Sequence, residues 1–295
     1  MKKTPIFTGS CTAIVTPYCE SGIDFAKMGE LIDFQANNGT SALVICGTTG
    51  ENATQNLEEH EELIQFCAKH NAGRMKLIAG IGSNDTNTAY RLGTAAAAEN
   101  YDGVLMVTPY YNKTTQAGLV QHFTYVADRV DAPMILYNVP SRTGIGISAE
   151  TYKILSEHPN INGIKEASGD LSLFSKTRYL CGDALNIWSG NDDNTVAMMA
   201  LGAKGVISVA SNVVPRAVAD MCQAALNGDF QTAQAIHMKY ADLFSTLFIE
   251  TNPIPVKTAM NLMGMQVGHL RLPLVDMQEK NLEILKASLK NLDLI

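Results

Sequence analysis

Eight short apolar segments, separated by helix-like stretches, constrain the fold of this 295-residue chain more than any other feature. Each segment is apolar throughout rather than alternating, as expected for parallel strands that are buried on both faces. A strand followed by a helix, repeated eight times, is typical of a (β/α)₈ TIM barrel. The predicted strands are residues 11–15, 42–46, 77–81, 103–107, 134–137, 163–165, 187–189 and 205–209.

Helical spacing of apolar residues fills the intervals between these strands and continues after the last one. We therefore predict a catalytic barrel over residues 1–228 and a helical region over 229–295 that packs against it. A doubly wound open sheet is the alternative, but it would more often carry a glycine-rich phosphate-binding fingerprint, and Gly144-Ile-Gly146 is an isolated fragment. The predicted helices are 24–38, 57–70, 86–99, 116–129, 149–157, 172–181, 216–227, 230–246, 255–263 and 276–289.

Composition excludes several classes of function. The net charge of -7 and the absence of a Lys/Arg-rich stretch argue against nucleic-acid binding. No apolar run approaches the roughly 18 residues of a membrane span, and Pro5, Thr8 and Gly9 interrupt the N-terminal segment, so we expect neither a membrane anchor nor a signal peptide. The six cysteines form no C-x-x-C pair and the six histidines are scattered. We expect a cytoplasmic protein without a metal site.

Lys165 is the residue with the most distinctive chemistry. It ends a predicted strand in Asn160-Ile-Asn-Gly-Ile-Lys-Glu-Ala-Ser-Gly-Asp170, and a Gly-Asp loop follows. Burial disfavours a charged amine, so a lysine facing a pocket has more of the free amine that attacks carbonyl groups. The alternative is a lysine at the rim that pairs with Glu166 and is partly solvated.

The turn after the second predicted strand, Gly47-Thr-Thr-Gly-Glu51, is a candidate carboxylate-binding site. Its hydroxyls and glycine-flanked backbone N–H groups could bind a small anion, and a helix begins soon after. Alternatively, the threonines cap that helix.

Other strand ends supply two tyrosines and an arginine. Tyr111 follows the fourth strand, whereas Tyr137 and Arg142 lie at the fifth. A tyrosine hydroxyl can transfer protons, although tyrosines at strand ends are often simple rim residues. Arg142 could bind a second carboxylate in bidentate geometry, or form a surface ion pair. Asp192 and Asp193 are adjacent and should point apart, so we expect a polar turn or helix cap there.

Barrel enzymes place their chemistry at the carboxyl ends of the strands, where these side chains would meet. An amine, tyrosine hydroxyls, a threonine-rich turn and an arginine suit an enzyme that captures a 2-oxo acid as a Schiff base. The resulting enamine attacks an aldehyde without a metal or organic cofactor. A protein that merely binds small acids is the competing hypothesis, but it leaves Lys165 beside Tyr137 without a purpose.

Three motifs resemble the dihydrodipicolinate synthase (4-hydroxy-tetrahydrodipicolinate synthase) family of pyruvate-dependent class I aldolases, a group that includes N-acetylneuraminate lyase. They are Gly47-Thr-Thr-Gly-Glu51, Tyr137-Asn-Val-Pro-Ser-Arg-Thr-Gly144 and Gly163-Ile-Lys-Glu-Ala-Ser-Gly169, and the similarity runs essentially end to end. The resemblance implies a class I (Schiff-base) carbon–carbon lyase that condenses pyruvate with L-aspartate 4-semialdehyde in lysine and diaminopimelate biosynthesis. The double threonine and Arg142 favour the synthase over N-acetylneuraminate lyase or 2-keto-3-deoxy-sugar-acid aldolases.

The same resemblance implies a catalytic set. Lys165 would form the imine with pyruvate and Tyr137 would relay protons. Thr48 would link Tyr137 to Tyr111, which would reach in from a neighbouring subunit. The family is usually a tetramer, a dimer of tight dimers, so we expect a homo-oligomer.

It also implies a substrate-binding set. Thr49 would hold the pyruvate carboxylate and Arg142 the carboxylate of aspartate semialdehyde. The backbone of Gly190 and Ile207 would line the pocket.

Family members that lysine inhibits carry an effector pocket at the dimer interface, and this chain matches it only in part. Losing the family's glutamate at Thr88 removes the charged partner of the effector's ammonium group, which should weaken binding by around 2–5 kcal/mol if the site is buried. We therefore expect feeble or absent feedback by lysine. The matching residues are Ala53, His60, Asn84 and Tyr110, whereas Asn52, Leu57 and Thr88 replace a serine, a histidine and the glutamate.

Overall fold

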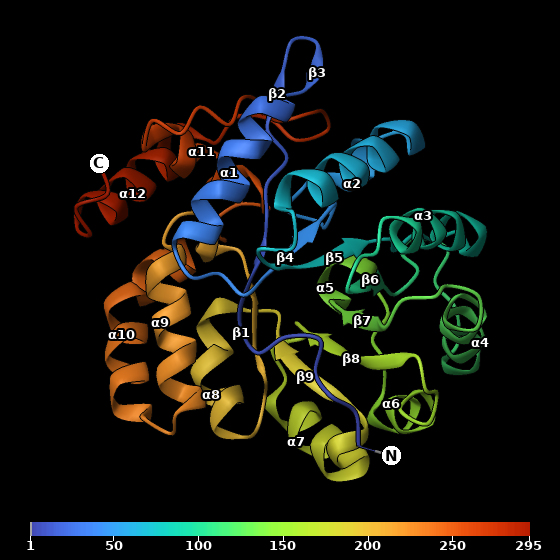
Figure 1. Ribbon diagram of the computed structural model, residues 1–295. Coiled ribbons are helices and arrows are strands. Elements are labelled where there is room, and N and C mark those ends of the chain that lie inside the picture. Colours follow the sequence, from blue (N-terminus) through green and yellow to red (C-terminus); the bar gives the residue numbers. More distant parts are fainter. Residues whose placement is uncertain (1) are drawn as a thin grey trace.

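A closed barrel of eight parallel strands forms the centre of the computed structural model, which describes residues 2–295 (Figure 1). Following the hydrogen bonds around the barrel, the strand order is β1-β10-β9-β8-β7-β6-β5-β4. Closure confirms the predicted TIM barrel and excludes the open doubly wound sheet. The strands are β1 (Gly9–Ala13), β4 (Ala42–Ile45), β5 (Lys76–Gly80), β6 (Gly103–Val107), β7 (Met134–Asn138), β8 (Ile161–Glu166), β9 (Asn186–Ser189) and β10 (Gly205–Ser208).

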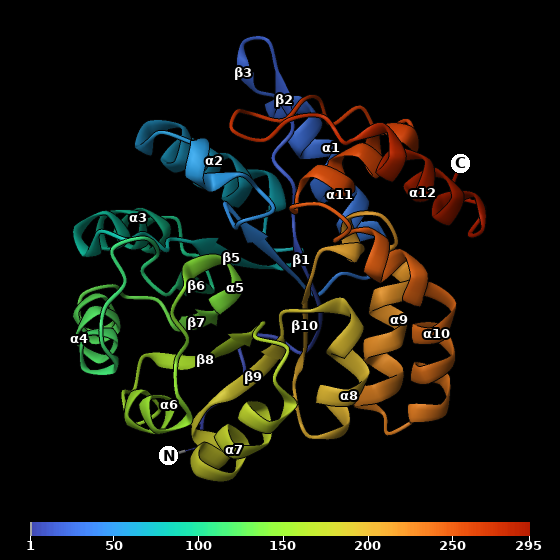
Figure 2. The same cartoon turned by 180° about the vertical axis from the view of Figure 1, so that it is seen from behind.

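Helices surround this barrel on the outside, as the view from behind also shows (Figure 2). Most of them match the predicted ranges, but two short helices were not predicted: α5 between β7 and α6, and α8 between β9 and β10. Short 3₁₀ turns occur at Asn52–Thr54, Gly182–Ala184, Asp192–Asn194 and Ala210–Asn212. The helices of the barrel are α1 (Phe25–Asn37), α2 (Leu57–Asn71), α3 (Thr86–Ala98), α4 (Gln116–Ala127), α5 (Pro140–Thr143), α6 (Ala149–Leu155), α7 (Leu171–Cys181), α8 (Thr195–Ala200) and α9 (Pro215–Leu226).

Strand β1 lies two residues earlier than predicted. The prediction of 11–15 followed the apolar run, but Ile14 and Val15 are buried beyond the end of the strand. The backbone N–H of Val15 donates to the side-chain oxygen of Asn212 rather than to a neighbouring strand. Apolar character therefore marks burial here, not strand pairing.

Alternate residues along each strand build two apolar layers. On β4, Ala42 and Val44 belong to the interior of the barrel, whereas Leu43 and Ile45 pack in the layer beneath the helices. The interior is closed below the site by Trp188, whose ring stacks on Phe7 at a centroid separation of 4.9 Å. Because the interior is filled, a ligand can enter only at an open end of the barrel.

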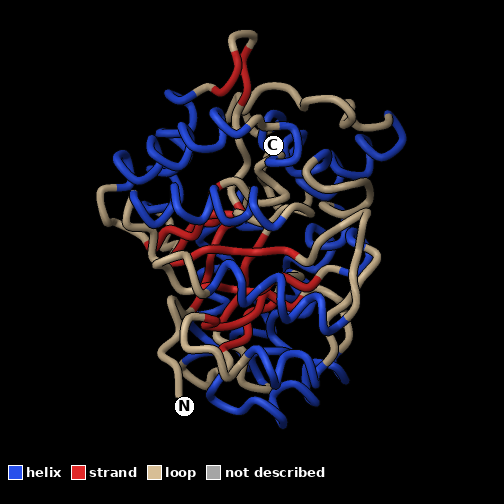
Figure 3. The backbone as a smooth tube through the Cα atoms, turned by 90° about the vertical axis from the view of Figure 1, so that its right-hand side faces the viewer, coloured by secondary structure: helices blue, strands red, loops and turns tan. Residues whose placement is uncertain are grey.

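The C-terminal region consists of α10 (Phe230–Thr246), α11 (Ile254–Leu262) and α12 (Glu279–Lys290). Helix α10 lies beside α9, whereas α11 and α12 lie near α1 (Figure 1). The small hairpin of β2 (Tyr18–Cys19) and β3 (Gly22–Ile23) forms the upper tip of the molecule (Figures 1 and 3). A bridge joins Tyr18 to Gly268. The helical extension is confirmed, whereas its separation from the barrel at residue 228 stays a prediction. No helix within 2–295 is both long and apolar enough to cross a membrane.

Candidate active site

Lys165 lies inside the barrel, near the carboxyl end of β8. Strand register pairs it with Tyr137 on β7 and with Trp188 on β9, and both partners belong to the interior layer. The Lys165 side chain is buried, and its Nζ lies 4.4 Å from the centroid of the Tyr137 ring. Gly163 permits this packing, because a Cβ there would lie 2.6 Å from the Trp188 ring. Strand geometry thus directs the amine into the barrel mouth.

Glu166 does not pair with Lys165, so the alternative of a solvated rim lysine is wrong. The next residue along a strand faces the opposite side, and Glu166 is itself buried. Its carboxylate accepts hydrogen bonds from Asn138 Nδ2 at 3.1 Å, Tyr152 OH at 2.9 Å and Ser168 N at 2.8 Å. Burial and this neighbouring carboxylate raise the pKa of Tyr152, so its phenol stays a donor.

A cavity of about 530 Å³ opens above Lys165. Six of the eight predicted catalytic and substrate-binding residues line it, namely Thr48, Thr49, Tyr137, Arg142, Lys165 and Gly190. The C-terminal region closes one side with residues 248–252, which sequence reasoning did not assign to the site. The cavity therefore joins residues at the ends of five barrel strands, β4, β7, β8, β9 and β10, to the helical extension.

The two threonines of the turn after β4 are held by backbone and side-chain contacts. Gly50 N donates to Gly47 O at 3.0 Å, and Glu51 adopts a left-handed conformation with φ of 57°. The helix-capping alternative is wrong, because Asn56 caps α2 and forms a capping box with Glu59. The threonine hydroxyls are therefore free of a capping role.

A buried ion pair fastens this turn to the C-terminal region. Lys257 Nζ on α11 lies 2.8 Å from Glu51 Oε1, and neither side chain is exposed beyond 1%. Lys257 also donates to the carbonyl oxygens of Thr16 and His269, and Glu51 Oε2 accepts from Arg271 N. Burial lowers the pKa of Lys257, whereas Glu51 opposes that shift. The extension thus supports the cavity wall through charge as well as packing.

Asn252, which precedes α11, contacts two of the predicted substrate-binding residues. Its side-chain Nδ2 donates to Thr49 Oγ1 at 3.0 Å. Its backbone carbonyl accepts from Arg142 Nη2, also at 3.0 Å. Asn252 lies between the predicted helices 230–246 and 255–263, where the sequence indicated no functional residue, so this contact was not predicted.

Tyr111 and Ile207 do not line the cavity of their own chain. Tyr111 is 92% exposed and has a positive φ of 71°. Ile207 is fully buried in the barrel interior. The prediction that the Ile207 backbone borders the ligand is therefore not supported by the cavity lining.

The residues aligned with the lysine-effector pocket do not share one hollow in the single chain. His60 is buried, its Nε2 lies 2.9 Å from Gly80 O, and burial lowers its pKa to about 4. Thr88 Oγ1 donates to Asp85 at 2.7 Å, and Leu57 is half-buried on α2. A cavity of about 190 Å³ is lined in part by Asn52, Ala53 and Tyr110, whereas Asn84 lines another.

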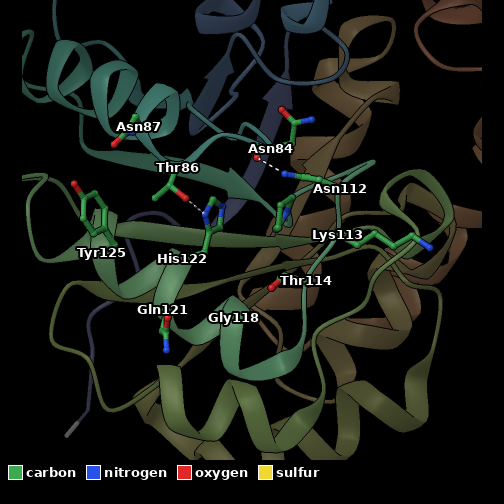
Figure 4. A pocket seen from close by; sticks show the side chains of 11 residues that line it. Asn84, Thr86, Asn87, Asn112, Lys113, Thr114, Gly118, Gln121, His122 and Tyr125 are labelled. Atoms are coloured by element: carbon green, nitrogen blue, oxygen red, sulfur yellow. Dashed lines mark hydrogen bonds between the residues drawn. The ribbon is translucent and has the colours of Figure 1, made fainter.

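That other hollow, of about 500 Å³, lies beside α3 and α4 (Figure 4). His122 projects into its wall with Nδ1 2.8 Å from Thr86 Oγ1, and Asn112 Nδ2 donates to Asn84 O at 2.9 Å. The hollow has a volume similar to that of the Lys165 cavity, but its lysine, Lys113, is exposed to solvent, whereas Lys165 is buried beside a tyrosine. Chemistry, not size, therefore makes the Lys165 cavity the candidate active site.

Asp192 and Asp193 point apart, as predicted. Asp192 is buried and its Oδ2 accepts from the backbone N–H groups of Val209 and Ala210, whereas Asp193 is exposed. Burial raises the pKa of Asp192. Within the described chain, no group of three or more His, Cys, Asp or Glu side chains could hold a metal ion.

Comparison with known proteins identifies the family. A family model described as the dihydrodipicolinate synthetase family matches residues 6–292. The chain belongs to this family. It is 50% identical over 292 residues to 4-hydroxy-tetrahydrodipicolinate synthase of Thermoanaerobacter sp. strain X514, covering 99% of this chain and 98% of the relative.

Solved structures agree with this assignment. Dihydrodipicolinate synthase from Aquifex aeolicus is 49% identical, with a TM-score of 0.95 and coverage of 98% of this chain and 99% of that one. A monomeric dihydrodipicolinate synthase variant is 41% identical, with a TM-score of 0.95 and coverage of 98% of each chain.

Proposed function

We propose that this chain is a 4-hydroxy-tetrahydrodipicolinate synthase, which condenses pyruvate with L-aspartate 4-semialdehyde for lysine and diaminopimelate biosynthesis. The observation that carries the proposal is the buried amine of Lys165, 4.4 Å from the centroid of the Tyr137 ring in a cavity that Thr49 and Arg142 also line. Family membership, with relatives of that name at 50% identity over nearly the full chain, supports it.

The chemistry begins when the free amine of Lys165 adds to C2 of pyruvate and water leaves, which gives a protonated imine. Loss of a proton from the pyruvate methyl group yields the enamine, because the imine accepts the electron pair. The enamine carbon attacks the aldehyde carbon of the second substrate and forms the new C–C bond. The substrate's own amine then displaces Lys165, which closes the ring and regenerates the enzyme. One water leaves overall, and neither a metal nor an organic cofactor is needed.

Tyr137 is the proposed proton relay at the imine and enamine. Its ring lies against Lys165 and it lines the cavity. Thr48 is the proposed link from Tyr137 toward Tyr111 of a neighbouring subunit. Positioned phenols of this kind contribute roughly 10²–10⁴ to the rate.

Thr49 and Arg142 are the proposed binders of the two substrate carboxylates. Both line the same cavity, and each forms a hydrogen bond with Asn252. Thr49 bonds to the Asn252 side chain, whereas Arg142 bonds to its backbone carbonyl. Gly190 contributes backbone only, because a Cβ there would lie 2.6 Å from Ala167 Cβ and 3.1 Å from Lys165 Cγ. The small residue keeps the approach to the amine open.

The proposed assembly is a homotetramer built as a dimer of dimers. Support comes from Tyr111, whose exposed ring lies outside the cavity of its own chain. Lysine inhibition is proposed to be weak, because Thr88 bonds locally to Asp85 and brings no carboxylate of its own. The six free cysteines are consistent with the reducing cytoplasm proposed as its location.

Borohydride trapping tests the Schiff base directly. Incubation with pyruvate and borohydride should add one reduced pyruvyl group, and peptide mapping should place it on Lys165. Lys165→Ala is the matched control and should gain no mass. A wild-type protein that binds pyruvate but gains no mass would be a binding protein rather than an aldolase, and the proposal would fall.

The aldehyde substrate is tested separately. Enzyme that has not been treated with borohydride should turn over pyruvate with aspartate semialdehyde, and N-acetylmannosamine and sugar-derived aldehydes serve as comparison substrates. Preferred turnover of a sugar aldehyde would assign the chain to the related sugar-acid aldolases instead.

A further inference from the structure

The Asn252 side chain makes one hydrogen bond among the described residues, although the residue is only 5% exposed. That bond runs from Nδ2 to Thr49 Oγ1 at 3.0 Å. Its Oδ1 atom is buried and meets no donor among residues 2–295. Among the described residues, Thr49 is therefore the hydrogen-bond partner that orients this side chain.

The bond fixes where the Thr49 proton can go. A hydroxyl has one O–H donor and two acceptor lone pairs, and Asn252 Nδ2 occupies one lone pair. The Thr49 O–H finds no acceptor among the described residues, although Thr49 is buried and lines the cavity. A hydroxyl that is held as an acceptor on one side presents its proton on the other, toward a ligand.

We propose that Asn252 is a positioning residue that aims the Thr49 hydroxyl at the pyruvate carboxylate, and this inference rests on the proposed function of Thr49 and Arg142. The same residue holds Arg142 by a different group, its backbone carbonyl. Asn252 thus sets the separation between the two carboxylate sites. Its side chain orients Thr49 for pyruvate, and its backbone carbonyl holds Arg142 for aspartate semialdehyde.

The segment around Asn252 is firmly held, as a positioning role requires. Ile254 N donates to Thr251 O at 2.9 Å, and Lys257 N donates to Pro253 O at 3.0 Å. One turn further on, Lys257 Nζ reaches the buried Glu51 of the same threonine turn. The backbone hydrogen bonds around Asn252 and the buried pair of Glu51 and Lys257 therefore hold the Asn252 amide and Thr49 in place relative to each other.

Because Asn252 contacts Thr49 through its side chain and Arg142 through its backbone, a side-chain substitution can separate the two roles. Asn252→Ala removes the amide but keeps the carbonyl that holds Arg142. We expect the KM for pyruvate to rise about tenfold or more, the scale of a hydrogen bond to a charged group, whereas the KM for aspartate semialdehyde should change less than about twofold. Equal increases in both KM values would show a general structural role and overturn the inference.

Asn252→Asp tests the direction of the bond. A carboxylate can accept from Thr49 but cannot donate to it, and it adds negative charge beside the pyruvate carboxylate. The KM for pyruvate should therefore rise more than in Asn252→Ala. An unchanged KM in Asn252→Asp would mean that Thr49 donates to residue 252, and the inference would be wrong.

A double substitution tests whether Asn252 acts through Thr49. In a Thr49→Val background, Asn252→Ala should raise the KM for pyruvate little further, because the hydroxyl it orients is gone. A full additional tenfold increase there would show an independent role and contradict the proposal.

Asn261→Ala is the matched control from the same helical region. Asn261 donates to Gly268 O and accepts from Val267 N, and it does not line the cavity. It should leave both KM values unchanged. If wild-type protein is not labelled by pyruvate and borohydride, the proposed function fails and this inference with it. If labelling succeeds and Asn252→Ala behaves as wild type, only the inference fails.

Discussion

Lys165 Nζ lies 4.4 Å from the centroid of the Tyr137 ring, and the two residues face each other across adjacent barrel strands. Their spacing is set by backbone register, the most rigid part of the fold, rather than by a mobile loop. Sites built on strands hold reacting groups to within fractions of an ångström, which preorganised catalysis demands.

The first prediction concerns the Tyr137 hydroxyl. Tyr137→Phe keeps the ring that packs in the barrel interior but removes the proton-carrying group. We expect kcat to fall about 10²- to 10⁴-fold, with an unchanged unfolding midpoint. Steady-state kinetics together with thermal denaturation measure both. Full activity in this variant would remove the proton relay from the mechanism.

The second prediction concerns the exposed Tyr111. If it completes a neighbour's site, Lys165→Ala and Tyr111→Phe subunits should each be nearly inactive alone. A mixed dimer pairs one intact lysine with one intact tyrosine in a single site, so random mixing should restore about one quarter of wild-type activity. The measurement is activity after co-refolding or co-expression of the two variants. No recovery in verified mixed dimers would place Tyr111 outside the partner's site.

The third prediction concerns regulation by L-lysine. Thr88 has no carboxylate and bonds to Asp85, while His60 is buried against Gly80. Initial rates should be nearly unaffected by lysine in the submillimolar range. Half-maximal inhibition below 1 mM would contradict this, and titration calorimetry would then locate the missing contact.

The fold could be predicted because each strand is recognisable from its own few residues. Strands buried on both faces carry continuous apolar runs, so eight such runs, as at 42–46 and 103–107, indicated the barrel before any contact was known. Strand ends were less accurate, because Ile14 and Val15 are buried beyond the end of β1. Apolar sequence reports burial, and only backbone pairing defines a strand.

The candidate site was predictable where its residues stand at the ends of recognisable strands, as Lys165 and Tyr137 do. Asn252 could not be found in this way, because it lies 203 positions from its partner Thr49 and follows no strand. The same holds for Lys257, which reaches Glu51 across 206 positions. Such contacts depend on how the helical extension folds back onto the barrel, and no local pattern encodes that path.

The fourth prediction concerns acid stability. His60 has a folded pKa of about 4 against an ordinary value of 6.5, because burial disfavours its charged form. Between these two pH values the unfolded chain binds the proton and the folded chain does not, so stability falls as pH decreases through that window. The loss should reach about 3 kcal/mol. His60→Gln, which retains an N–H donor for Gly80, should flatten this part of the profile in urea denaturation series. Parallel profiles for the two proteins would assign the acid sensitivity to other groups.

The fifth prediction concerns the buried pair of Glu51 and Lys257. Either Glu51→Gln or Lys257→Met leaves one uncompensated buried group and should lower the free energy of unfolding by about 3–5 kcal/mol. The double variant removes both charges, so its loss should be clearly smaller than the sum of the single losses. Denaturant unfolding at fixed protein concentration measures these values. Glu150→Gln, which breaks the solvent-exposed pair with Lys176, is the control and should change the free energy of unfolding far less than either buried substitution. Additive losses at Glu51 and Lys257 would show that the ion pair does not couple the threonine turn to the helical extension.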